Sequence, residues 1–441
     1  AAAAQMREKI GKALEEKLRE DSYNDHVAKQ MALIHRANII TIDSFCLKIV
    51  RENFNSLGID PTSRVADTAE MDLIKSDVLG ELLEDKYQEG QENYLNFVEC
   101  FSQDKTDENI ETIVNKIYTI ASSYSYPSLW LEKAKKAILF EDERQLNEAL
   151  WMINLIDKTK ITIGDIKETI LKLIEICDKP YGPYMYKEAL IKDIEWMDEI
   201  ASCKLYQHFA EAFSIKPATL KSCRDKDVDA NLMLNVKATR DKYKKVLKDL
   251  NVFGSPVEDI ISDMKNVAET VEVVIDLVME YSKRLDIVKR KKNIMEFADV
   301  EHMALTVLCQ GYDEEGRVIP SNIAKKISKK YEEVFIDEYQ DSNFLQEDIL
   351  TCVSRSHMGE YNIFMVGDVK QSIYKFRMAR PDLFIDKYNT YKEHGDFKKI
   401  ELKNNFRSRN TVLESINYIF YQIMTESVGG IKYNKEAALV P

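Results

Sequence analysis

The chain has 441 residues, with 14 glycines and 9 prolines, and its formal net charge is −13 at pH 7. This length is sufficient for two or three domains with cores of their own. Because glycine and proline are few, we expect mostly helix and short loops. The acidic balance excludes a surface that is basic throughout, but it is compatible with a local basic channel for nucleic acid.

The seven cysteines are scattered and form no C-x-x-C pair. This pattern is typical of reduced, metal-free proteins of the cytoplasm. No stretch reaches about 18 consecutive apolar residues, and the N-terminus lacks the layout of a signal peptide. We therefore expect a cytoplasmic protein without a membrane span.

A helical pattern opens the chain, which does not begin with methionine. Its apolar stripe consists of Met6, Ile10, Leu14 and Leu18, at the spacing of one helix face. We interpret this beginning as a cut into a longer protein. A short apolar run at 37–42 then predicts a buried strand that gives way to polar residues.

Long helical patterns with almost no strand signal occupy residues 56–294. One helix start is well marked, because Ser255, Pro256 and Glu258 supply an N-cap, a proline at the first helical position and a capping-box glutamate. Apolar residues then recur every three or four positions as far as Leu285. We predict a large helical insertion that splits an α/β domain.

Two weaker signals lie in this insertion. The basic run 283–292 fits either a contact with double-stranded DNA or a solvated helix end, where cations favour the C-terminus. We interpret Trp130, Trp151 and Trp196 as core residues.

Three more short apolar runs follow the insertion, at 334–336, 363–366 and 399–402, and polar residues follow each of them. Such continuous apolar runs are typical of parallel strands covered by helices on both faces. Open α/β sheets bind ligands at the carboxyl ends of their strands. We therefore expect the polar clusters to converge on one crevice.

The first cluster, DEYQD at 337–341, places two adjacent carboxylates directly after a predicted strand. Proteins usually hold Mg²⁺ with one or two carboxylates together with the phosphates of the substrate. Asp337 is therefore a candidate Mg²⁺ ligand, and Glu338 is a candidate base for the water that attacks a γ-phosphate. An isolated pair of this kind is more often an acidic loop after a core strand, and the clusters that follow decide against that interpretation.

The second cluster is GDVKQSIYKFR at 367–377. From a tight turn at its start, Gln371 can hydrogen-bond toward a γ-phosphate and report its presence. Phe376 and Arg377 combine a flat apolar face with a cation, as sites for single-stranded DNA do. For Phe376, and likewise for Tyr374, a place in the core is the alternative.

The third cluster is NFRS at 405–408. Arg407 can stabilise charge on a transferred phosphoryl group, and Phe406 can stack on an adenine ring. Taken alone, Arg407 would be interpreted as a surface arginine and Phe406 as a core phenylalanine. Three such clusters in this order on strand ends indicate a site that hydrolyses a nucleotide.

These clusters resemble motifs II, III and IV of the superfamily 1 helicases. In addition, TIDSF at 41–45 resembles the single-strand-binding motif Ic, and AAAAQM resembles the end of motif Ia. The sequence of 367–377 is closer to the RecB- and AddA-type helicase-nucleases than to the UvrD, Rep and PcrA helicases. The latter usually have tryptophan at the position of Phe376. The long insertion and the segment 295–302 agree with this, although Glu296 stands where that family often has aspartate.

The resemblance implies a fold and its division into domains. The fold class is α/β, with an incomplete RecA-like parallel-sheet P-loop NTPase motor domain, a large all-helical inserted domain and the start of a second RecA-like domain. Motor domain 1A would comprise 1–55 and 295–378. The inserted domain 1B would comprise 56–294, and motor domain 2A would begin within 379–441.

The resemblance also implies roles for single residues. Asp337 would hold Mg²⁺, Glu338 would be the catalytic base, Gln371 would sense the γ-phosphate of ATP, Arg407 would contact it, and Phe406 would flank the adenine. Candidates for contact with single-stranded DNA are Thr41, Ser44, Phe45, Tyr374, Phe376 and Arg377.

The implied function is that of an ATP-driven DNA helicase that moves 3′ to 5′. In its full length such an enzyme is also an exonuclease, and with an AddB-like second subunit it processes double-strand breaks for recombination and DNA repair. A UvrD-type repair helicase and a non-catalytic DNA-binding module with a degenerate ATP site are the alternatives.

One expected motif is missing, because no G-x-x-x-x-G-K-[ST] occurs in the sequence. Without that loop nothing here cradles the β-phosphate. The later helicase motifs and a nuclease domain are not found either. We therefore expect an internal fragment of a longer enzyme, and we expect this fragment by itself to show no efficient ATP hydrolysis, unwinding or nuclease activity.

Overall fold

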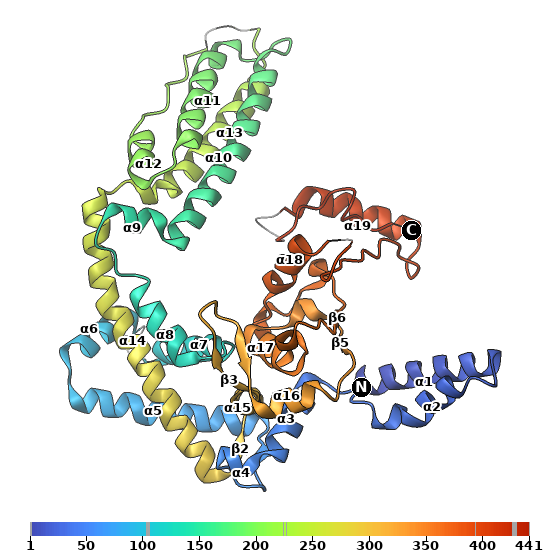
Figure 1. Cartoon of the computed structure of the whole chain (residues 1–441). Coiled ribbons are helices and arrows are strands. Elements are labelled where there is room, and N and C mark those ends of the chain that lie inside the picture. Colours follow the sequence, from blue (N-terminus) through green and yellow to red (C-terminus); the bar gives the residue numbers. More distant parts are fainter. Residues whose placement is uncertain are drawn as a thin grey trace. The chain divides into compact units, whose positions relative to one another are not determined.

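The computed structural model describes residues 2–102, 106–223, 225, 227–392, 394–425 and 430–440. The chain divides into two compact units. Unit 1 comprises Ala1–Leu131 and Asp276–Pro441, and unit 2 comprises Glu132–Ile275. Helices predominate in both units, and the strands of the described residues are short and paired (Figure 1).

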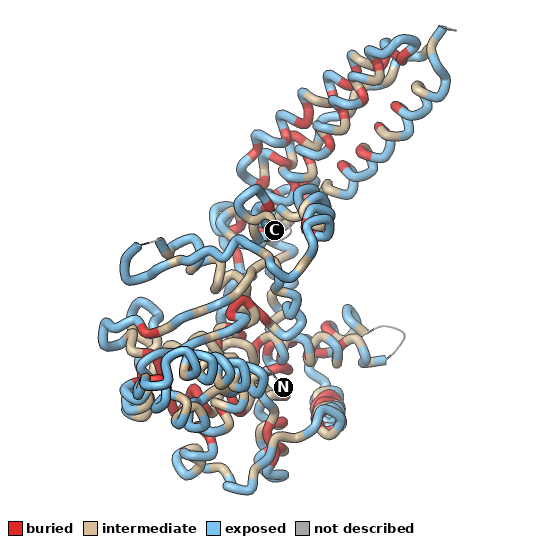
Figure 2. The backbone as a smooth tube through the Cα atoms, turned by 90° about the vertical axis from the view of Figure 1, so that its right-hand side faces the viewer, coloured by how far each residue is buried: buried red, intermediate tan, exposed pale blue. Residues whose placement is uncertain are grey.

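Unit 2 is a bundle of helices, in which α10 runs alongside α11 and α13 (Figure 1). Its elements are α9 (Glu143–Glu148), α10 (Leu150–Cys177), α11 (Lys187–Ser202), α12 (Tyr206–Phe213), α13 (Ala230–Asp249), the end of α8 (Pro127–Lys136) and the first part of α14 (Val257–Lys292). Buried positions recur along the helices (Figure 2). They include Ile170, Leu190, Met197 and Phe209, and burying each such side chain contributes about 1.5–3 kcal/mol.

A buried ion pair lies inside this bundle. Arg240 donates to Asp193 from Nε to Oδ2 at 2.7 Å and from Nη2 to Oδ1 at 2.9 Å. The hydroxyl of Tyr243 donates to the same Oδ2 at 2.5 Å, and Arg240 Nη2 also reaches the carbonyl of Ala218 at 2.6 Å. Both charges are therefore satisfied by hydrogen bonds, as buried charges must be.

Unit 1 is built around one packed group of three helices. Its helices are α1 (Ala2–Glu20), α2 (Asp25–Leu33), α3 (Ile42–Glu52), α4 (Phe54–Leu57), α5 (Thr68–Glu89), α6 (Glu92–Phe101), α7 (Glu108–Ala121), α15 (Phe297–Leu308), α16 (Asn322–Ser328), α17 (Phe344–Val353), α18 (Pro381–Thr390) and α19 (Asn410–Ile423). Cys46 and Ile49 of α3 pack with Ala304 of α15 and with Leu345 and Ile349 of α17. This core holds the start of α3 and the segments around α17 in place.

The strands of unit 1 form three pairs. They are β1 (Arg64–Val65) parallel to β2 (Ile294–Met295), β3 (Cys309–Tyr312) antiparallel to β4 (Val318–Pro320), and β5 (Val334–Ile336) parallel to β6 (Ile363–Met365). In the last pair Val334 lies opposite Ile363 and Ile336 opposite Met365. Two of the four strands predicted from apolar runs are therefore confirmed, and they are parallel neighbours.

The prediction of a strand at 37–42 is wrong. Residues 37–41 form no strand, and Thr41 is the N-cap of α3, whose first residue is Ile42. The carbonyl of Ile39 accepts a hydrogen bond from Arg7 Nη2 at 3.2 Å, where a strand would use a neighbouring backbone. A run of so few apolar residues gains little from burial, and Ile40 is 38% exposed.

The prediction of a strand at 399–402 is also wrong. Ile400 is 63% exposed and Leu402 is 88% exposed, so no core holds this run in a sheet. Backbone pairing near it is limited to isolated bridges between Lys392 and Lys398 and between Asn404 and Val440.

The prediction that the strands are covered on both faces fails for β5 and β6 as well. Phe335 is 73% exposed and Phe364 is 48% exposed, and their rings lie 5.7 Å apart on one side of the pair. The residues that alternate with them, such as Ile336 and Met365, are partly buried. This alternation is the pattern of a sheet with one open face.

Helices form most of the described part of 56–294, as predicted, but the range is not all-helical, because β1 lies within it and pairs with β2. Helix α14 begins at Val257, one residue after Pro256. In the basic run, Lys289 is buried and pairs with Asp299 at 2.6 Å, and Arg284 pairs with Asp85 at 2.6 Å. Part of this run therefore serves contacts within the protein, and neither a solvated helix end nor a DNA contact describes all of it.

The core prediction holds for one tryptophan and fails for another. Trp196 is buried and donates from Nε1 to the carbonyl of Ala212 at 2.7 Å. Trp151 is 40% exposed. Trp130 is partly buried and stacks on Tyr124 with ring centroids 4.9 Å apart.

All seven cysteines are free thiols. Among the described residues, no helix has both the length and the apolar composition that crossing a membrane requires.

Candidate active site

The polar clusters at 337–341 and 367–371 meet at the carboxyl ends of β5 and β6. Backbone pairing continues past the strands, because Val366 N donates to the carbonyl of Ile336 at 2.8 Å and Tyr339 N donates to the carbonyl of Val366 at 2.9 Å. Convergence at one sheet edge is thus confirmed for the first two clusters.

In the turn after β5, two carboxylates face the solvent and the next two side chains are buried. Asp337 and Glu338 are exposed, whereas Tyr339 is fully buried and Gln340 is 1% exposed. Glu338 has the left-handed backbone angles φ 52° and ψ 41°, and it precedes the short 3₁₀ helix η4 (Tyr339–Asp341). A non-glycine residue in this region costs about 1–2 kcal/mol, and such strain is concentrated at functional sites.

Buried contacts fix this turn. The Tyr339 hydroxyl donates to Glu347, which also pairs with Lys387 of α18 at 2.7 Å. Asp337 Oδ1 accepts the backbone N–H of Glu338 at 3.0 Å. The backbone that carries the two exposed carboxylates is therefore fixed by contacts on its buried side.

Gln340 is a site residue that no pattern in the sequence singles out. Its Nε2 donates to Glu338 Oε2 at 2.7 Å, and its Oε1 accepts the backbone N–H of Asp368 at 3.0 Å. It therefore joins the ends of the two strands. Its place within the acidic cluster at 337–341 was visible in the sequence, but its burial was not.

The turn after β6 is organised by Asp368. Its Oδ2 accepts from Gln371 Nε2 at 3.0 Å, and its Oδ1 accepts from the backbone N–H of Lys370 at 3.1 Å. The ammonium of Lys370 lies 3.0 Å from the same Oδ1. Gln371 is exposed at the end of the 3₁₀ helix η6 (Val369–Gln371). Glu338 and Gln371 thus stand at opposite ends of one continuous hydrogen-bonded path.

Among the described residues, two buried polar atoms beside this path make no hydrogen bond of ordinary geometry. They are Asp341 Oδ1 and Ser372 Oγ. Burial and the nearby charge of Glu338 raise the pKa of Asp341, although the Gln340 amide and the Ser372 hydroxyl lie close enough to Asp341 to oppose this shift. Unpaired buried polar atoms are rare because each costs about 1–3 kcal/mol, so this edge of the sheet is not optimised for stability alone.

The aromatic residues of the second cluster lie on the surface. Phe376 is 70% exposed and Tyr374 is 38% exposed, so the alternative that they belong to the core is wrong. The Arg377 guanidinium lies 5.1 Å from the Tyr374 ring centroid and 5.8 Å from that of Phe376. These distances are typical of cation–π contacts, and they group the three side chains into one patch.

The candidate DNA-binding residues at the start of α3 are used partly in capping the helix. Thr41 Oγ1 accepts the backbone N–H of Ser44 at 3.3 Å and donates to Ser44 Oγ at 2.9 Å. Phe45 is partly buried against the core of unit 1. Burial raises the pKa of Asp43, and the positive charge of Arg377 opposes this shift. Among the described residues, no ion pair or hydrogen bond joins Arg377 to Asp43.

The third cluster forms a turn before α19. Asn405 Oδ1 accepts from the backbone N–H groups of Arg407 and Ser408, both at 3.0 Å. Phe406 is 90% exposed and Arg407 is exposed, so neither is a core residue. Among the described residues, no hydrogen bond or ion pair joins Arg407 to Glu338 or Gln371. The structure therefore does not bring the third cluster into contact with the first two.

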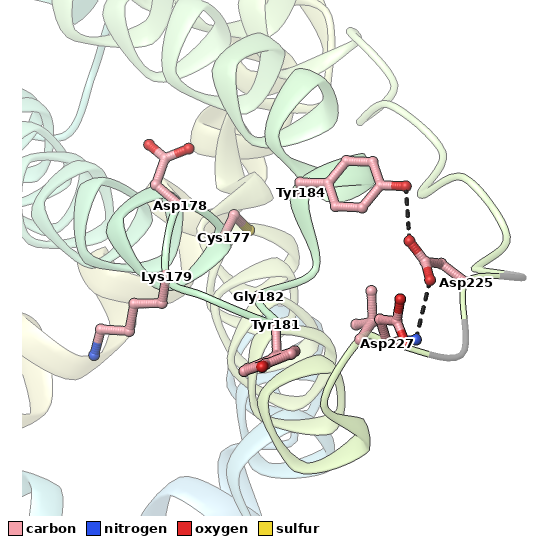
Figure 3. A pocket seen from close by; sticks show the side chains of 9 residues that line it. Cys177, Asp178, Lys179, Tyr181, Gly182, Tyr184, Asp225 and Asp227 are labelled. Atoms are coloured by element: carbon pink, nitrogen blue, oxygen red, sulfur yellow. Dashed lines mark hydrogen bonds between the residues drawn. The ribbon is translucent and has the colours of Figure 1, made fainter.

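A hollow of about 310 Å³ lies in unit 2 and is unrelated to these strand ends (Figure 3). Across it the Tyr184 hydroxyl donates to Asp225 Oδ2 at 3.1 Å, and Asp225 Oδ1 accepts the backbone N–H of Asp227 at 3.0 Å. These groups satisfy one another, and we assign them no chemistry.

Comparison with known proteins identifies the family. Residues 1–392 match the model of the UvrD/REP helicase N-terminal domain. The chain belongs to this helicase family. This agrees with a mostly helical protein that has small sheets, and it confirms the resemblance to superfamily 1 helicases.

Curated relatives within this helicase family cover all of this chain. Proteins named as the A-type subunit of an ATP-dependent helicase/nuclease are 44% identical in Lachnoclostridium phytofermentans, 38% in Clostridium beijerinckii and 37% in Clostridium acetobutylicum. The matches cover 100% of this chain in each case, and 32%, 36% and 36% of the respective relatives. The chain thus spans about a third of the length of these relatives.

Proposed function

We propose that this chain is part of an ATP-dependent DNA helicase-nuclease of the AddA type, and that it carries the magnesium-binding and water-activating side of the ATP site. The observation that carries the proposal is the pair Asp337 and Glu338. Both are exposed at the end of a parallel strand, and Glu338 is connected by hydrogen bonds to Gln371. A merely acidic loop needs neither the strained backbone nor the connection.

The donor set at this strand end fits Mg²⁺. Asp337 offers an exposed carboxylate, with Glu338 beside it, and no group of three or more metal-binding side chains is found among the described residues. Mg²⁺ keeps several waters and needs only one or two carboxylates when it also binds phosphates. When bound, the ion would neutralise charge on the phosphates of ATP.

The remaining steps fall to side chains of this chain. Glu338 accepts a proton from the attacking water, and Gln371 hydrogen-bonds to the γ-phosphate. Phe406 stacks on the adenine and Arg407 contacts the γ-phosphate. The exposed position of both supports these roles, which require the turn before α19 to approach the strand ends.

Single-stranded DNA would bind at the surface formed by the start of α3 and the patch of Tyr374, Phe376 and Arg377. Exposed aromatic rings beside a guanidinium can stack on bases and attract the phosphate backbone. The hydroxyls of Thr41 and Ser44 and the edge of Phe45 would border the same strand. The exposure of Thr41, Ser44, Tyr374, Phe376 and Arg377 supports their availability to DNA.

The finer assignments follow from this proposal. The parallel pair β5 and β6 would belong to a RecA-like sheet, with 1–55 and 295–378 as domain 1A, 56–294 as domain 1B and 379–441 as the start of domain 2A. The complete enzyme would be a cytoplasmic protein that moves 3′ to 5′, processes double-strand breaks for recombination, degrades DNA as an exonuclease and pairs with an AddB-like subunit. The names of the relatives support the helicase and nuclease activities and membership of a complex with further subunits.

The test is Glu338→Gln in the complete protein, because this change removes the base and keeps the shape. We expect ATP turnover to fall by about 10²-fold or more, while binding of a nucleotide analogue and of single-stranded DNA stays within about twofold. Glu333→Gln, an exposed acid just before β5, is the matched control and should leave turnover unchanged. Retained turnover in Glu338→Gln would remove Glu338 from the proposed role.

A further inference from the structure

We propose that Gln340 is a positioning residue, which holds Glu338 in place for catalysis and couples it to Gln371 through Asp368. The inference rests on the proposed function of Glu338 and Gln371, and it adds a role for a side chain that touches neither substrate nor metal. It predicts that the base and the phosphate sensor act as one connected unit.

Both ends of the Gln340 amide are engaged in a site that excludes water. The side chain is 1% exposed, its Nε2 lies 2.7 Å from Glu338 Oε2, and its Oε1 lies 3.0 Å from the backbone nitrogen of Asp368. Because the oxygen must face an N–H group, the nitrogen must face the carboxylate. The amide therefore has one orientation, and Glu338 receives a donor at a fixed point.

Gly367 provides the room that this arrangement needs. A Cβ atom at position 367 would lie 2.5 Å from Gln340 Oε1 and 3.3 Å from the Gln340 backbone nitrogen. The first distance is far below a van der Waals contact, so any side chain at 367 would displace the amide oxygen. The glycine at the end of β6 thus serves the Gln340 amide as well as the turn.

The fixed donor has a consequence for catalysis. Glu338 is exposed and has several rotatable bonds, so without a partner its carboxylate would occupy several rotamers. The bond from Gln340 engages Oε2 and directs the other oxygen outward, toward the attacking water. Misplacing a catalytic group by about 1 Å can reduce a rate by about 10²-fold.

Asp368 makes the two ends of the path depend on each other. Its backbone N–H donates a hydrogen bond to Gln340. Its carboxylate accepts a hydrogen bond from Gln371 at 3.0 Å and forms an ion pair with Lys370 at 3.0 Å. If Gln371 moves toward a γ-phosphate, its hydrogen bond to the Asp368 carboxylate changes. Asp368 transmits this change to the Gln340 amide through its backbone N–H. Hydrogen bonds in such chains strengthen one another.

A purely structural role is the competing explanation, because a buried amide also satisfies the N–H of Asp368. The two roles differ in what they affect. A structural role lowers the stability of the protein and, with it, every activity. A positioning role lowers kcat by far more than the accompanying loss of stability explains, and it leaves nucleotide binding and DNA binding nearly unchanged.

The first experiment compares Gln340→Met with Gln346→Met in the complete protein. Methionine keeps the unbranched shape and removes the hydrogen bonds to Glu338 and Asp368, together with the longer one to Asp341 at 3.4 Å. Gln346 is the matched control, because its Nε2 also donates to a carboxylate, that of Glu301, at 2.8 Å. We expect Gln340→Met to lower DNA-stimulated kcat for ATP about tenfold or more, with KM for ATP and Kd for single-stranded DNA within about twofold. Gln346→Met should leave kcat within about twofold.

The second experiment tests the role of Gly367 with a double-mutant cycle. Gly367→Ala should also lower kcat, because the new methyl group displaces the Gln340 amide. In Gln340→Ala the atom closest to the new methyl group is gone, and only the Gln340 backbone nitrogen at 3.3 Å and Phe384 Cε1 at 3.4 Å remain close to it. Adding Gly367→Ala should therefore reduce kcat clearly less in Gln340→Ala than in the parent. Such non-additivity is the signature of two residues that act through one contact. Fully multiplicative losses would overturn the proposed contact.

The outcomes separate this inference from the function on which it rests. If Glu338→Gln is inactive while Gln340→Met keeps full kcat, the positioning role is wrong and the proposed function stands. If Gln340→Met loses kcat only in proportion to Tm, Gln340 is structural and the inference is overturned. If Glu338→Gln keeps its turnover, the proposed function fails, and the positioning of a base by Gln340 fails with it.

Discussion

Two polar clusters in this molecule are each centred on a carboxylate, and they differ in how many hydrogen bonds that carboxylate accepts from the protein. In unit 2, Asp193 is 1% exposed and accepts two hydrogen bonds from Arg240 and one from Tyr243. At the strand ends of unit 1, Glu338 is exposed and accepts one hydrogen bond from Gln340, beside buried atoms of Asp341 and Ser372 to which the described residues offer no hydrogen bond of ordinary geometry. A closed cluster stabilises the fold, whereas an open one retains capacity to bind something else.

Breaking the closed cluster should have the largest effect. Asp193→Asn leaves the Arg240 charge buried without a counter-charge, and we expect the free energy of unfolding to fall by about 3–5 kcal/mol. Denaturant titration monitored by circular dichroism measures this. The control is Asp198→Asn, whose pair with Lys167 is exposed and should be worth at most about 1 kcal/mol. Equal small losses in both variants would show that burial does not distinguish the clusters.

Glu301 sharpens the comparison, because it is a buried carboxylate with one amide partner, Gln346. Burial raises the pKa of Glu301 from 4.5 to about 7, and the charge of Asp43 adds to the shift, although the hydrogen bond from Gln346 opposes it. Between these pH values the folded state keeps a proton that the unfolded state has lost. Stability should therefore decline as the pH rises from 4.5 to about 7.

Glu301→Gln should remove that decline, because its side chain carries no charge at any pH. We expect the variant to be more stable than the parent by about 1–3 kcal/mol at pH 8. The two should be nearly equal at a pH close to 4.5. Tm measured across this range checks the sign. A parent protein that gains stability toward pH 8 would contradict the direction of the shift.

The exposed end of the comparison is tested by Phe376→Ala in the complete protein. If the ring stacks on a base, affinity for single-stranded DNA should weaken by about 1–3 kcal/mol in fluorescence anisotropy. Stability should not change, because the side chain is 70% exposed. Tyr418→Ala is the matched control, with 71% exposure on α19, and it should leave DNA affinity unchanged. Equal affinities in all three proteins would remove Phe376 from the DNA surface.

The sequence was sufficient to predict the strands β5 and β6 and the helical insertion. Each of these is marked by a run of apolar residues or by periodicity that continues over many residues. It was not sufficient at 37–42 and 399–402, where the apolar run looks the same but no neighbouring core covers it. Whether such a run is buried depends on partners distant in the chain.

The same limit applies to the site. The proposed roles of Asp337, Glu338 and Gln371 were inferred from residue type, spacing and family resemblance. The structure places Glu338 and Gln371 on one hydrogen-bonded path, with Asp337 next to it at the end of β5. Gln340 was missed because no pattern in a single sequence distinguishes a buried glutamine from an exposed one. Arg407 and Phe406 were predicted at the same crevice, and among the described residues they remain without a contact to it.

The left-handed backbone at Glu338 determines which substitutions can report on its chemistry. Glycine, asparagine and aspartate adopt this conformation readily, whereas β-branched residues avoid it. A valine or threonine at this position would disturb the turn as well as remove the carboxylate, so its loss of activity would have two causes. Glutamine changes the charge alone. The sequence carries a long acidic side chain where the backbone favours a short one, as the proposed role of Glu338 as a base requires.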